Sequence, residues 1–289
     1  MSDLKRYLAY DKSVRTIVID ATEMVQKIRD IHNLSNLATA ALGRVMIVSA
    51  MIASTLKDEN NRLTVQIKGD GPLGNIVVCA NKNLDVKGYI QGTDIELPLN
   101  KEGKLDVSKG IGMGTLTVIK DIGLKEPYVG TCELLSGEIG DDFAYYFNVS
   151  EQTPSVVSVG VLIGKDGNVA KAGGYIIQPL PDCEEKIIDK LEQINVKIPS
   201  MTTLMSEGRT IDDIAQNVTG DNNIESVYEH DVNVKCDCSI ERIKNTIIAL
   251  GKKEAMDILK EQGILEISCR FCNKKYRFNQ EQINEIFNK

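Results

Sequence analysis

Two close pairs of cysteines near the C-terminus constrain this chain more than any other feature. They stand in the sequences CDC at 236–238 and CRFC at 269–272, with residues 239–268 between them. Two pairs on separate segments can bring four thiolates to one tetrahedral centre, and zinc accepts four sulfurs without redox chemistry of its own. The spacing therefore predicts one zinc ion per chain, although the same spacing also suits two disulfides. The predicted ligands are Cys236, Cys238, Cys269 and Cys272.

A closed site of four cysteines has two interpretations. With no open coordination position, it would be a structural zinc knuckle that never changes state. However, a single residue separates Cys236 from Cys238, which places two thiols close enough for exchange within the pair. The spacing permits a redox switch without proving one.

The other cysteines and the histidines indicate no enzyme active site. Cys79 and Cys132 lie in apolar strand-like patterns, which predicts buried, inert thiols, and Cys183 lies near a loop and has no assigned role. His32 and His230 are the only histidines, so no Cys-His or Ser-His-Asp arrangement can be assembled. We interpret His230 as a surface or strand residue. The chain is thus predicted not to be an enzyme.

The charge distribution argues against nucleic acid as a partner. The chain of 289 residues has a formal net charge of -7. Residues 232–289 carry 11 Lys and Arg against 8 Asp and Glu, a net charge of +3, so the remainder carries -10. A surface that binds phosphate backbones over a wide area would need a strong basic patch.

The sequence also argues against a membrane. The N-terminal residues MSDLKRY contain no apolar signal segment, and we expect no run to approach the length of a membrane span. The chain is therefore predicted to be cytoplasmic. In that reducing compartment a site of four thiolates persists, and disulfide formation would be an event rather than a resting state.

The patterns along the chain predict an α+β fold in three parts. Residues 1–180 form an N-terminal α/β core domain with a mostly antiparallel sheet, 181–231 a helical linker, and 232–289 a small C-terminal zinc-binding domain. In the first part, alternating or Val/Ile-rich runs predict strands at 13–20, 62–69, 75–81, 86–92, 114–122, 128–134, 155–164 and 169–179. Apolar stripes predict helices at 22–32, from a cap at Ser35 to Thr55, and at 141–151. The glycine-rich GDGPLG at 69–74 lacks the Lys-Ser/Thr of a phosphate-binding loop and predicts a hairpin turn.

The other two parts are mainly helical. Residues 182–218 predict three short amphipathic helices whose apolar stripes cover the face of a sheet. The last part is expected to contain a strand at 226–234, a helix from the cap Ser239 to Leu250, and a helix at 252–262 that stops at Gly263. Strands are expected on both sides of the second cysteine pair. A final helix follows a capping box of Asn279 and Gln282.

Several segments together resemble one family, the redox-regulated heat-shock holdases of the bacterial heat-shock protein 33 family. The resemblance covers nearly the whole chain. It rests on CDCSIERI and CRFCNKKYRF in the tail, on SEQTPS at 150–155 and on AGGYIIQPLP at 172–181. His32, the ALGR at 41–44 and the GDGPLG turn are also similar to the N-terminal pattern of this family.

This resemblance implies a chaperone that works without ATP and is inactive while it is reduced and zinc-bound. It further implies that oxidation joins Cys236 to Cys238 and Cys269 to Cys272, releases zinc, and unfolds the tail together with the helical linker. The active family members are associated with dimers, and the partners are unfolded client proteins. On this basis we assign the linker stripe to client binding. Its residues are Ile187, Leu191, Met201 and Leu204.

Two other classes of protein stay open on the sequence. A thiol oxidoreductase would turn over its cysteines on a substrate, and would need exposed thiols of lowered pKa rather than four metal ligands. A structural zinc-ribbon protein that binds nucleic acid or the ribosome is opposed by the acidic body and the weakly charged tail.

Overall fold

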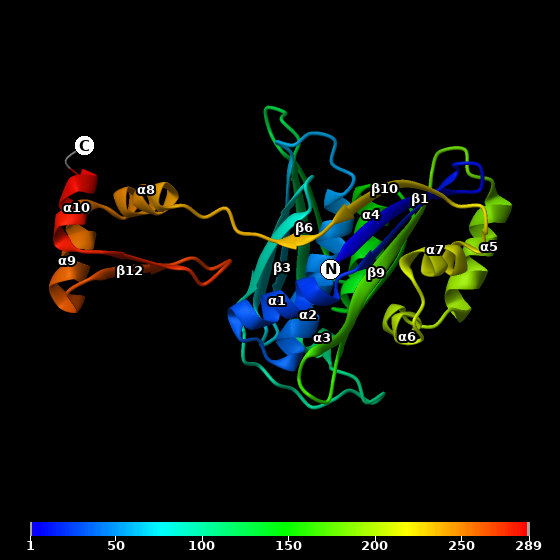
Figure 1. The fold of residues 1–289 in the computed structure, drawn as a ribbon, viewed down its shortest axis with the longest axis horizontal. Coiled ribbons are helices and arrows are strands. Elements are labelled where there is room, and N and C mark those ends of the chain that lie inside the picture. Colours follow the sequence, from blue (N-terminus) through cyan, green and yellow to red (C-terminus); the bar gives the residue numbers. More distant parts are fainter. Residues whose placement is uncertain (1, 288–289) are drawn as a thin grey trace. The chain divides into compact units, whose positions relative to one another are not determined.

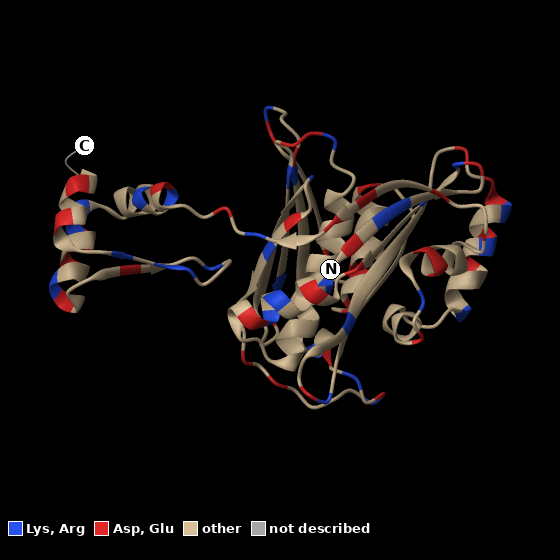
Figure 2. Cartoon of the chain, viewed as in Figure 1, with Lys and Arg blue, Asp and Glu red and all other residues tan. Residues whose placement is uncertain are grey.

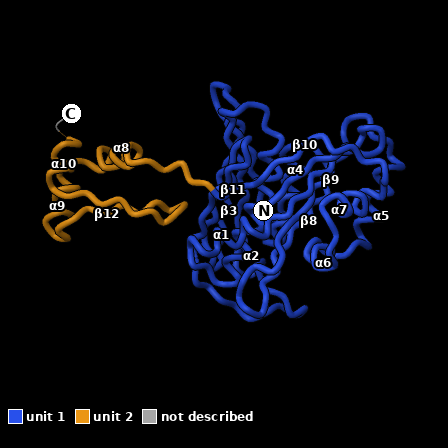
Figure 3. The backbone as a smooth tube through the Cα atoms, in the orientation of Figure 1, with its two compact units in different colours: residues 1–234 blue, residues 235–289 orange. Residues whose placement is uncertain are grey.

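The computed structural model describes residues 2–287, which form two compact units. The first unit spans residues 1–234 and the second spans residues 235–289 (Figure 3). By its packing the predicted linker belongs to the first unit. The separate role of residues 181–231 stays a prediction.

A five-stranded sheet forms one layer of the first unit, with the strand order β10-β1-β2-β9-β8 (Figure 1). Every neighbouring pair is antiparallel. The strands are β1 (Asp3–Ala9), β2 (Val14–Asp20), β8 (Val156–Ile163), β9 (Val169–Pro179) and β10 (Glu225–Asp231). Strand β1 is not among the predicted strands. A bulge between Arg6 and Tyr7 interrupts its pairing with β10, so its burial does not follow a simple alternation.

A six-stranded sheet forms a second layer, with the order β11-β5-β4-β3-β6-β7. Its pairs are antiparallel except for the short parallel pair of β11 with β5. The strands are β3 (Arg62–Gly69), β4 (Asn75–Asn81), β5 (Asp85–Ile90), β6 (Gly114–Asp121), β7 (Tyr128–Glu133) and β11 (Asn233–Val234). The predicted α+β class with mostly antiparallel sheets is therefore confirmed. The single strand expected at 226–234 is instead divided, because β10 pairs in the first sheet and β11 in the second.

Helix α2 (Asn36–Ala53) fills the space between the two sheets and contacts strands of both. Ser35 caps it as predicted, since its hydroxyl accepts a hydrogen bond from the Ala38 amide at 3.1 Å. Contrary to expectation, α2 is long and apolar enough to cross a membrane by length and composition alone, with a mean hydropathy of 1.5. Yet 89% of the helix is buried inside the protein, so α2 forms part of the core. The neighbouring helices are α1 (Thr22–His32), α3 (Val107–Ile111) and α4 (Ile139–Ser150).

The GDGPLG segment is a hairpin turn between β3 and β4, as predicted. Gly74 has a φ of +62°, a left-handed conformation that glycine adopts without steric cost. The Asp70 carboxylate accepts a hydrogen bond from the Met113 amide at 2.8 Å, and the Gly71 amide donates to the Ile111 carbonyl. The turn therefore anchors the end of α3, a helix of five residues that the sequence patterns did not predict.

Three helices follow β9 and cover the other face of the five-stranded sheet, as predicted. They are α5 (Glu185–Lys197), α6 (Met201–Ser206) and α7 (Ile211–Thr219). Their apolar faces form one buried cluster with strand residues such as Val14, Val18 and Tyr175. The helical members of this cluster are Leu191, Met201, Leu204, Met205, Ile214, Ala215 and Val218.

Polar contacts also hold α7 to β1. The Tyr7 hydroxyl donates to Asp212 Oδ1 at 2.7 Å, and Lys5 Nζ donates to Asp212 Oδ2 at 3.2 Å. The Tyr7 hydrogen bond, with help from Lys5, holds the pKa of Asp212 below its ordinary value of 3.8, although burial acts in the opposite direction. The contact therefore stabilises the fold fully above that ordinary value and loses its effect as the pH falls through the lower folded-state pKa.

The Tyr7→Phe variant is expected to loosen α7 selectively. Loss of one such hydrogen bond costs about 1 kcal/mol, so the amides of α7 should exchange with solvent deuterium about fivefold faster. Tyr145→Phe is the matched control, because the Tyr145 hydroxyl makes no hydrogen bond within residues 2–287. Equal exchange in both variants would show that the Tyr7 hydroxyl does not hold the helix.

The second unit is built around a small apolar core. Its elements are α8 (Ile240–Leu250), α9 (Lys252–Gln262), β12 (Leu265–Ser268), β13 (Lys275–Phe278) and α10 (Gln280–Phe287). The predicted caps are present: the Ser239 hydroxyl accepts from the Arg242 amide, and Asn279 and Gln282 bond reciprocally. The buried core residues are Ile243, Ile247, Ala255, Leu259, Leu265, Tyr276, Phe278 and Ile283.

Candidate metal centre

The two cysteine pairs lie on turns of the second unit. Cys236 and Cys238 come just before α8, while Cys269 and Cys272 lie on the turn of the β12–β13 hairpin. The Cys269 amide donates to the Lys274 carbonyl at 2.9 Å, and the Asn273 amide donates to the Cys269 carbonyl at 2.8 Å. Asn273 has a φ of 56°, a left-handed conformation that asparagine tolerates. These bonds fold the second pair into a tight knuckle.

The structure brings the sulfur atoms of both pairs together. The four Sγ atoms all lie within 4.8 Å of one another, and each side chain is half-buried. Cys236 Sγ lies 3.7 Å from Cys269 Sγ, and Cys238 Sγ lies 3.5 Å from Cys272 Sγ. Zinc–sulfur bonds of about 2.3 Å imply about 3.8 Å between the sulfurs of a regular tetrahedron. The four residues therefore fit a tetrahedral metal ion of this size.

The four thiols do not share one environment. The Tyr276 hydroxyl donates a hydrogen bond to Cys238 Sγ at 3.2 Å. Burial raises the pKa of Cys236 and of Cys272. Burial acts in the same direction at Cys238, but hydrogen bonds from Tyr276 and the other three thiols outweigh it and lower that pKa to about 7. Hydrogen bonding thus favours the thiolate form at Cys238, the form that binds metal.

Tyr276 is the residue of this site that the sequence patterns missed. It lies on β13 directly opposite Ile267 of β12, and its ring is buried in the core of the second unit while its hydroxyl reaches Cys238. Its position four residues after Cys272, in the extended segment KKYRF, was the available signal. The sequence alone does not give the strand register of the β12–β13 hairpin, and that register places the Tyr276 side chain beside Cys238.

Comparison with known proteins identifies the family. A family model described as "Hsp33 protein" matches residues 2–279. The chain belongs to the Hsp33 family. This confirms the resemblance found in the sequence.

Relatives in the Hsp33 family match along nearly their full lengths. A 33 kDa chaperonin of Thermoanaerobacter sp. (strain X514) is 46% identical over 282 residues, which are 97% of this chain and 96% of that protein. A 33 kDa chaperonin of Caldanaerobacter subterraneus subsp. tengcongensis is 45% identical over 279 residues, 96% of this chain and 95% of that protein. The crystal structure of the 33 kDa chaperonin from Thermotoga maritima matches with a TM-score of 0.92 and 37% identity, covering 99% of this chain and 97% of that one. These relatives support a chaperone function.

The other cysteines of this Hsp33-family chain lie apart from the cluster. Cys79 on β4, Cys132 on β7 and Cys183 before α5 are free thiols and half-buried. The expectation that Cys79 and Cys132 are buried was thus too strong. Cys79 alternates with the buried Val78 and Ala80 on β4, whereas Cys132 lies on the edge strand β7, where Gly130 is the one buried residue. Burial, with a smaller contribution from Asp142, raises the pKa of Cys132, which disfavours its reactive thiolate.

The histidines also lie outside the cluster. His230 is an exposed residue of β10 whose Nδ1 lies 2.7 Å from the Asp231 carbonyl, which agrees with its interpretation as a surface strand residue. His32 is half-buried at the end of α1, and its Nε2 lies 3.1 Å from the Gly88 carbonyl.

The residues assigned to client binding are largely hidden. Leu191, Met201 and Leu204 are 3%, 1% and 2% exposed, and Ile187 is half-buried beside them. The buried cluster that hides them contains strand residues of the first unit, including Tyr7, Val18 and Ile177. Any exposure of these residues therefore requires α5, α6 and α7 to leave that sheet.

Proposed function

We propose that the chain is a redox-regulated chaperone that holds unfolding and oxidatively damaged proteins without ATP. In its reduced form, which is inactive, Cys236, Cys238, Cys269 and Cys272 bind one zinc ion. The observation that carries the proposal is the cluster of four Sγ atoms within 4.8 Å of one another in a chain of the Hsp33 family. We infer a cytoplasmic location, where a reducing environment keeps these thiols available.

The stability of the second unit would depend on the metal. Structural zinc supplies about 10–16 kcal/mol of apparent binding free energy to a small module, whereas a whole domain is stable by about 5–15 kcal/mol. The apolar core of a unit of this size rarely supplies more than about 3–5 kcal/mol by itself. Losing the metal would therefore unfold the core that Ile247, Leu265 and Phe278 form.

Oxidation would remove the ligands. With hydrogen peroxide as oxidant, the two cysteines of one pair give up two electrons and form one S–S bond. One hydrogen peroxide takes up these electrons and two protons, from the thiols or from water, and becomes two molecules of water. Two such steps convert all four ligands into disulfides. A disulfide sulfur is a poor ligand compared with a thiolate, so the four cysteines would no longer hold a zinc ion and the second unit would unfold.

The disulfides are expected to be Cys236–Cys238 and Cys269–Cys272. In the folded site the contacts of Cys236 with Cys269 and of Cys238 with Cys272 each join one cysteine of each pair, so the folded geometry does not itself select this pairing. The reason lies in the unfolding segment, where thiols close in sequence have a far higher effective concentration for each other than distant ones. Peptide mapping after treatment with peroxide and mild heat tests this. A majority of bonds between the two pairs would contradict it.

Clients would bind apolar surface that the reduced form hides. We propose that unfolding of the second unit extends into α5, α6 and α7 and exposes Ile187, Leu191, Met201 and Leu204. These side chains are packed on the first unit's sheet in the structure, which accounts for an inactive reduced state. The oxidised protein is proposed to form a homodimer.

The binding of clients distinguishes this proposal from its competitors. A holdase suppresses aggregation in proportion to its amount, whereas a thiol oxidoreductase would turn over a dithiol substrate many times. Along the ribbon of both units, Lys and Arg positions are interspersed with Asp and Glu positions (Figure 2). This distribution favours protein clients over nucleic acid.

A further inference from the structure

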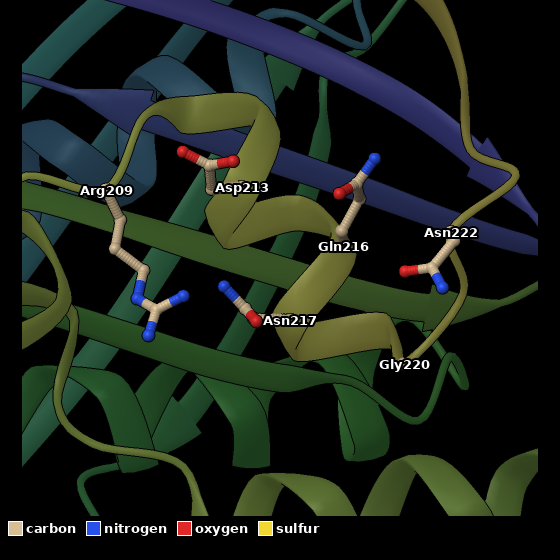
Figure 4. A pocket seen from close by; sticks show the side chains of 6 residues that line it. All are labelled: Arg209, Asp213, Gln216, Asn217, Gly220 and Asn222. Atoms are coloured by element: carbon tan, nitrogen blue, oxygen red, sulfur yellow. The ribbon is translucent and has the colours of Figure 1, made fainter.

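The three helices α5, α6 and α7 line a groove, and Leu204 is the one lining residue that the proposed mechanism already assigns to client binding. The groove has a volume of about 580 Å³. Its lining residues are Lys190, Gln193, Ile194, Lys197, Ile198, Pro199, Leu204, Glu207, Arg209 and Asn217. A second hollow of about 310 Å³ shares Arg209 and Asn217 with it. Figure 4 shows this second hollow, where the side chains of Arg209 and Asn217 extend toward one another.

The lining combines an apolar floor with a basic rim. Ile194 and Ile198, which are half-buried, and the exposed Pro199 supply apolar surface, and Leu204, which is 2% exposed, lies at the bottom. Lys190, Lys197 and Arg209 supply three positive charges against the single negative charge of Glu207. Such a groove complements a molecule that is apolar along its length and negatively charged at one end.

The groups that would hold the charged end are available. Within residues 2–287 the side chains of Gln193, Lys197 and Asn217 make no hydrogen bond or ion pair. Arg209 Nε pairs with Glu207 at 3.4 Å, but both side chains are nearly half exposed, at 46% and 48%. Exposed pairs of this kind are weak, so Arg209 can turn to a ligand at little cost.

We propose that this groove binds a small aliphatic carboxylate, with the chain on Ile194, Ile198 and Pro199 and the carboxylate between Lys197 and Arg209. The volume lies within the range of about 300–1,000 Å³ that is typical of small-molecule sites. It suits one short alkyl chain rather than a folded protein surface. The guanidinium and ammonium groups supply charge-assisted hydrogen bonds to the carboxylate.

Such a ligand would act on the switch, and this part rests on the proposed function. The lining comes from three helices that meet only while they pack on the first unit's sheet, so the site is lost when they separate. A ligand that binds only the packed form at 100 times its dissociation constant lowers the population of the opened form by about 100-fold. The carboxylate is therefore a negative effector. When it is bound, a larger dose of oxidant is needed to activate the chaperone.

Decanoate, below its micelle-forming concentration, is the probe for the reduced, zinc-bound full chain. Calorimetry is expected to give saturable binding of one decanoate per chain. Decyltrimethylammonium, with the same chain and the opposite charge, and acetate, with the head group alone, are expected not to bind. Deuterium exchange of the amides of α5, α6 and α7 should slow by up to about 100-fold near saturation.

Two exposed residues permit a variant that preserves the fold. The double variant Lys197→Gln/Arg209→Gln is expected to weaken decanoate binding by about tenfold or more. Lys186→Gln on the same helix is the control, since Lys186 is exposed, lies outside the groove and should leave binding unchanged. Equal affinity in the double variant, equal binding of the cationic chain, or no binding of decanoate overturns the proposal. Because binding and exchange are measured on the reduced form, they are independent of whether oxidation activates a chaperone.

Discussion

Replacing Cys269 with serine is expected to remove zinc from the reduced protein and to unfold residues 235–289. The four Sγ atoms lie within 4.8 Å of one another, so one loss opens a closed tetrahedron. A serine hydroxyl stays protonated and does not replace a thiolate ligand. Because the metal contributes about 10–16 kcal/mol to such modules, a large part of that stabilisation disappears. Metal analysis should find less than one tenth of the wild-type zinc, and deuterium exchange should find the amides of α8 and α9 unprotected.

Cys183→Ser is the control for this experiment. Cys183 is also a half-buried free cysteine, but it lies outside the cluster, so this variant should keep one zinc per chain. Full zinc content in Cys269→Ser would contradict the assignment of the ligands. Loss of zinc without unfolding would contradict the dependence of the second unit on the metal.

After oxidation with peroxide and mild heat, the protein is expected to suppress aggregation of an unfolding client nearly stoichiometrically without nucleotide, whereas the reduced zinc form should have almost no effect. The reason is that Leu191, Met201 and Leu204 are at most 3% exposed in the folded structure and become accessible only when their helices leave the sheet. Light scattering of a thermally unfolding client measures the effect, with zinc release recorded in the same sample. Equal suppression of aggregation by the oxidised and the reduced form would show that the four cysteines form a purely structural metal site.

A test of the client-binding surface requires a variant that weakens client binding without disrupting the packing of the folded protein. A charge at Leu191, Met201 or Leu204 would also disrupt the folded cluster, because burying an unpaired charge is costly. Ile187 is only half-buried, so Ile187→Glu in the oxidised form is expected to weaken client binding. Val196→Glu on the same helix is the control, since Val196 is 85% exposed and lies outside the buried cluster. An equal loss of client binding in both variants would show that the apolar stripe is not a specific client-binding surface.

Local signals predicted most of the secondary structure well. Strand β3 has the predicted bounds Arg62–Gly69, and α8 begins after the predicted cap Ser239. Asn279 and Gln282 form the predicted capping box. These features depend on residues within a few positions of one another, so the sequence carries them directly. The four-cysteine cluster was also predictable, because the spacing of the two pairs is a known pattern for metal ligands.

Features that depend on distant partners were missed. Strand β1 is stabilised by β2 on one side and by β10 on the other, and β10 lies more than 200 residues further along the chain in the register Asp3↔Asp231. Helix α3 is short and anchored by the turn at Asp70 and Gly71. The contact of Tyr276 with Cys238 depends on the register of the β12–β13 hairpin.

The sequence by itself determined the cluster of four cysteines, the amphipathic character of α5, α6 and α7, and the family. Only the tertiary structure decided what those helices bury and what they leave open. A stripe such as Leu191 with Leu204 shows that a helix has an apolar face, but not which surface covers it. That surface is assembled from Tyr7 and Val18, which lie on the consecutive strands β1 and β2, and from Ile177 on β9, which lies more than 150 residues further along the chain. Burial is a property of the assembled surface, because apolar area leaves water only where distant segments meet.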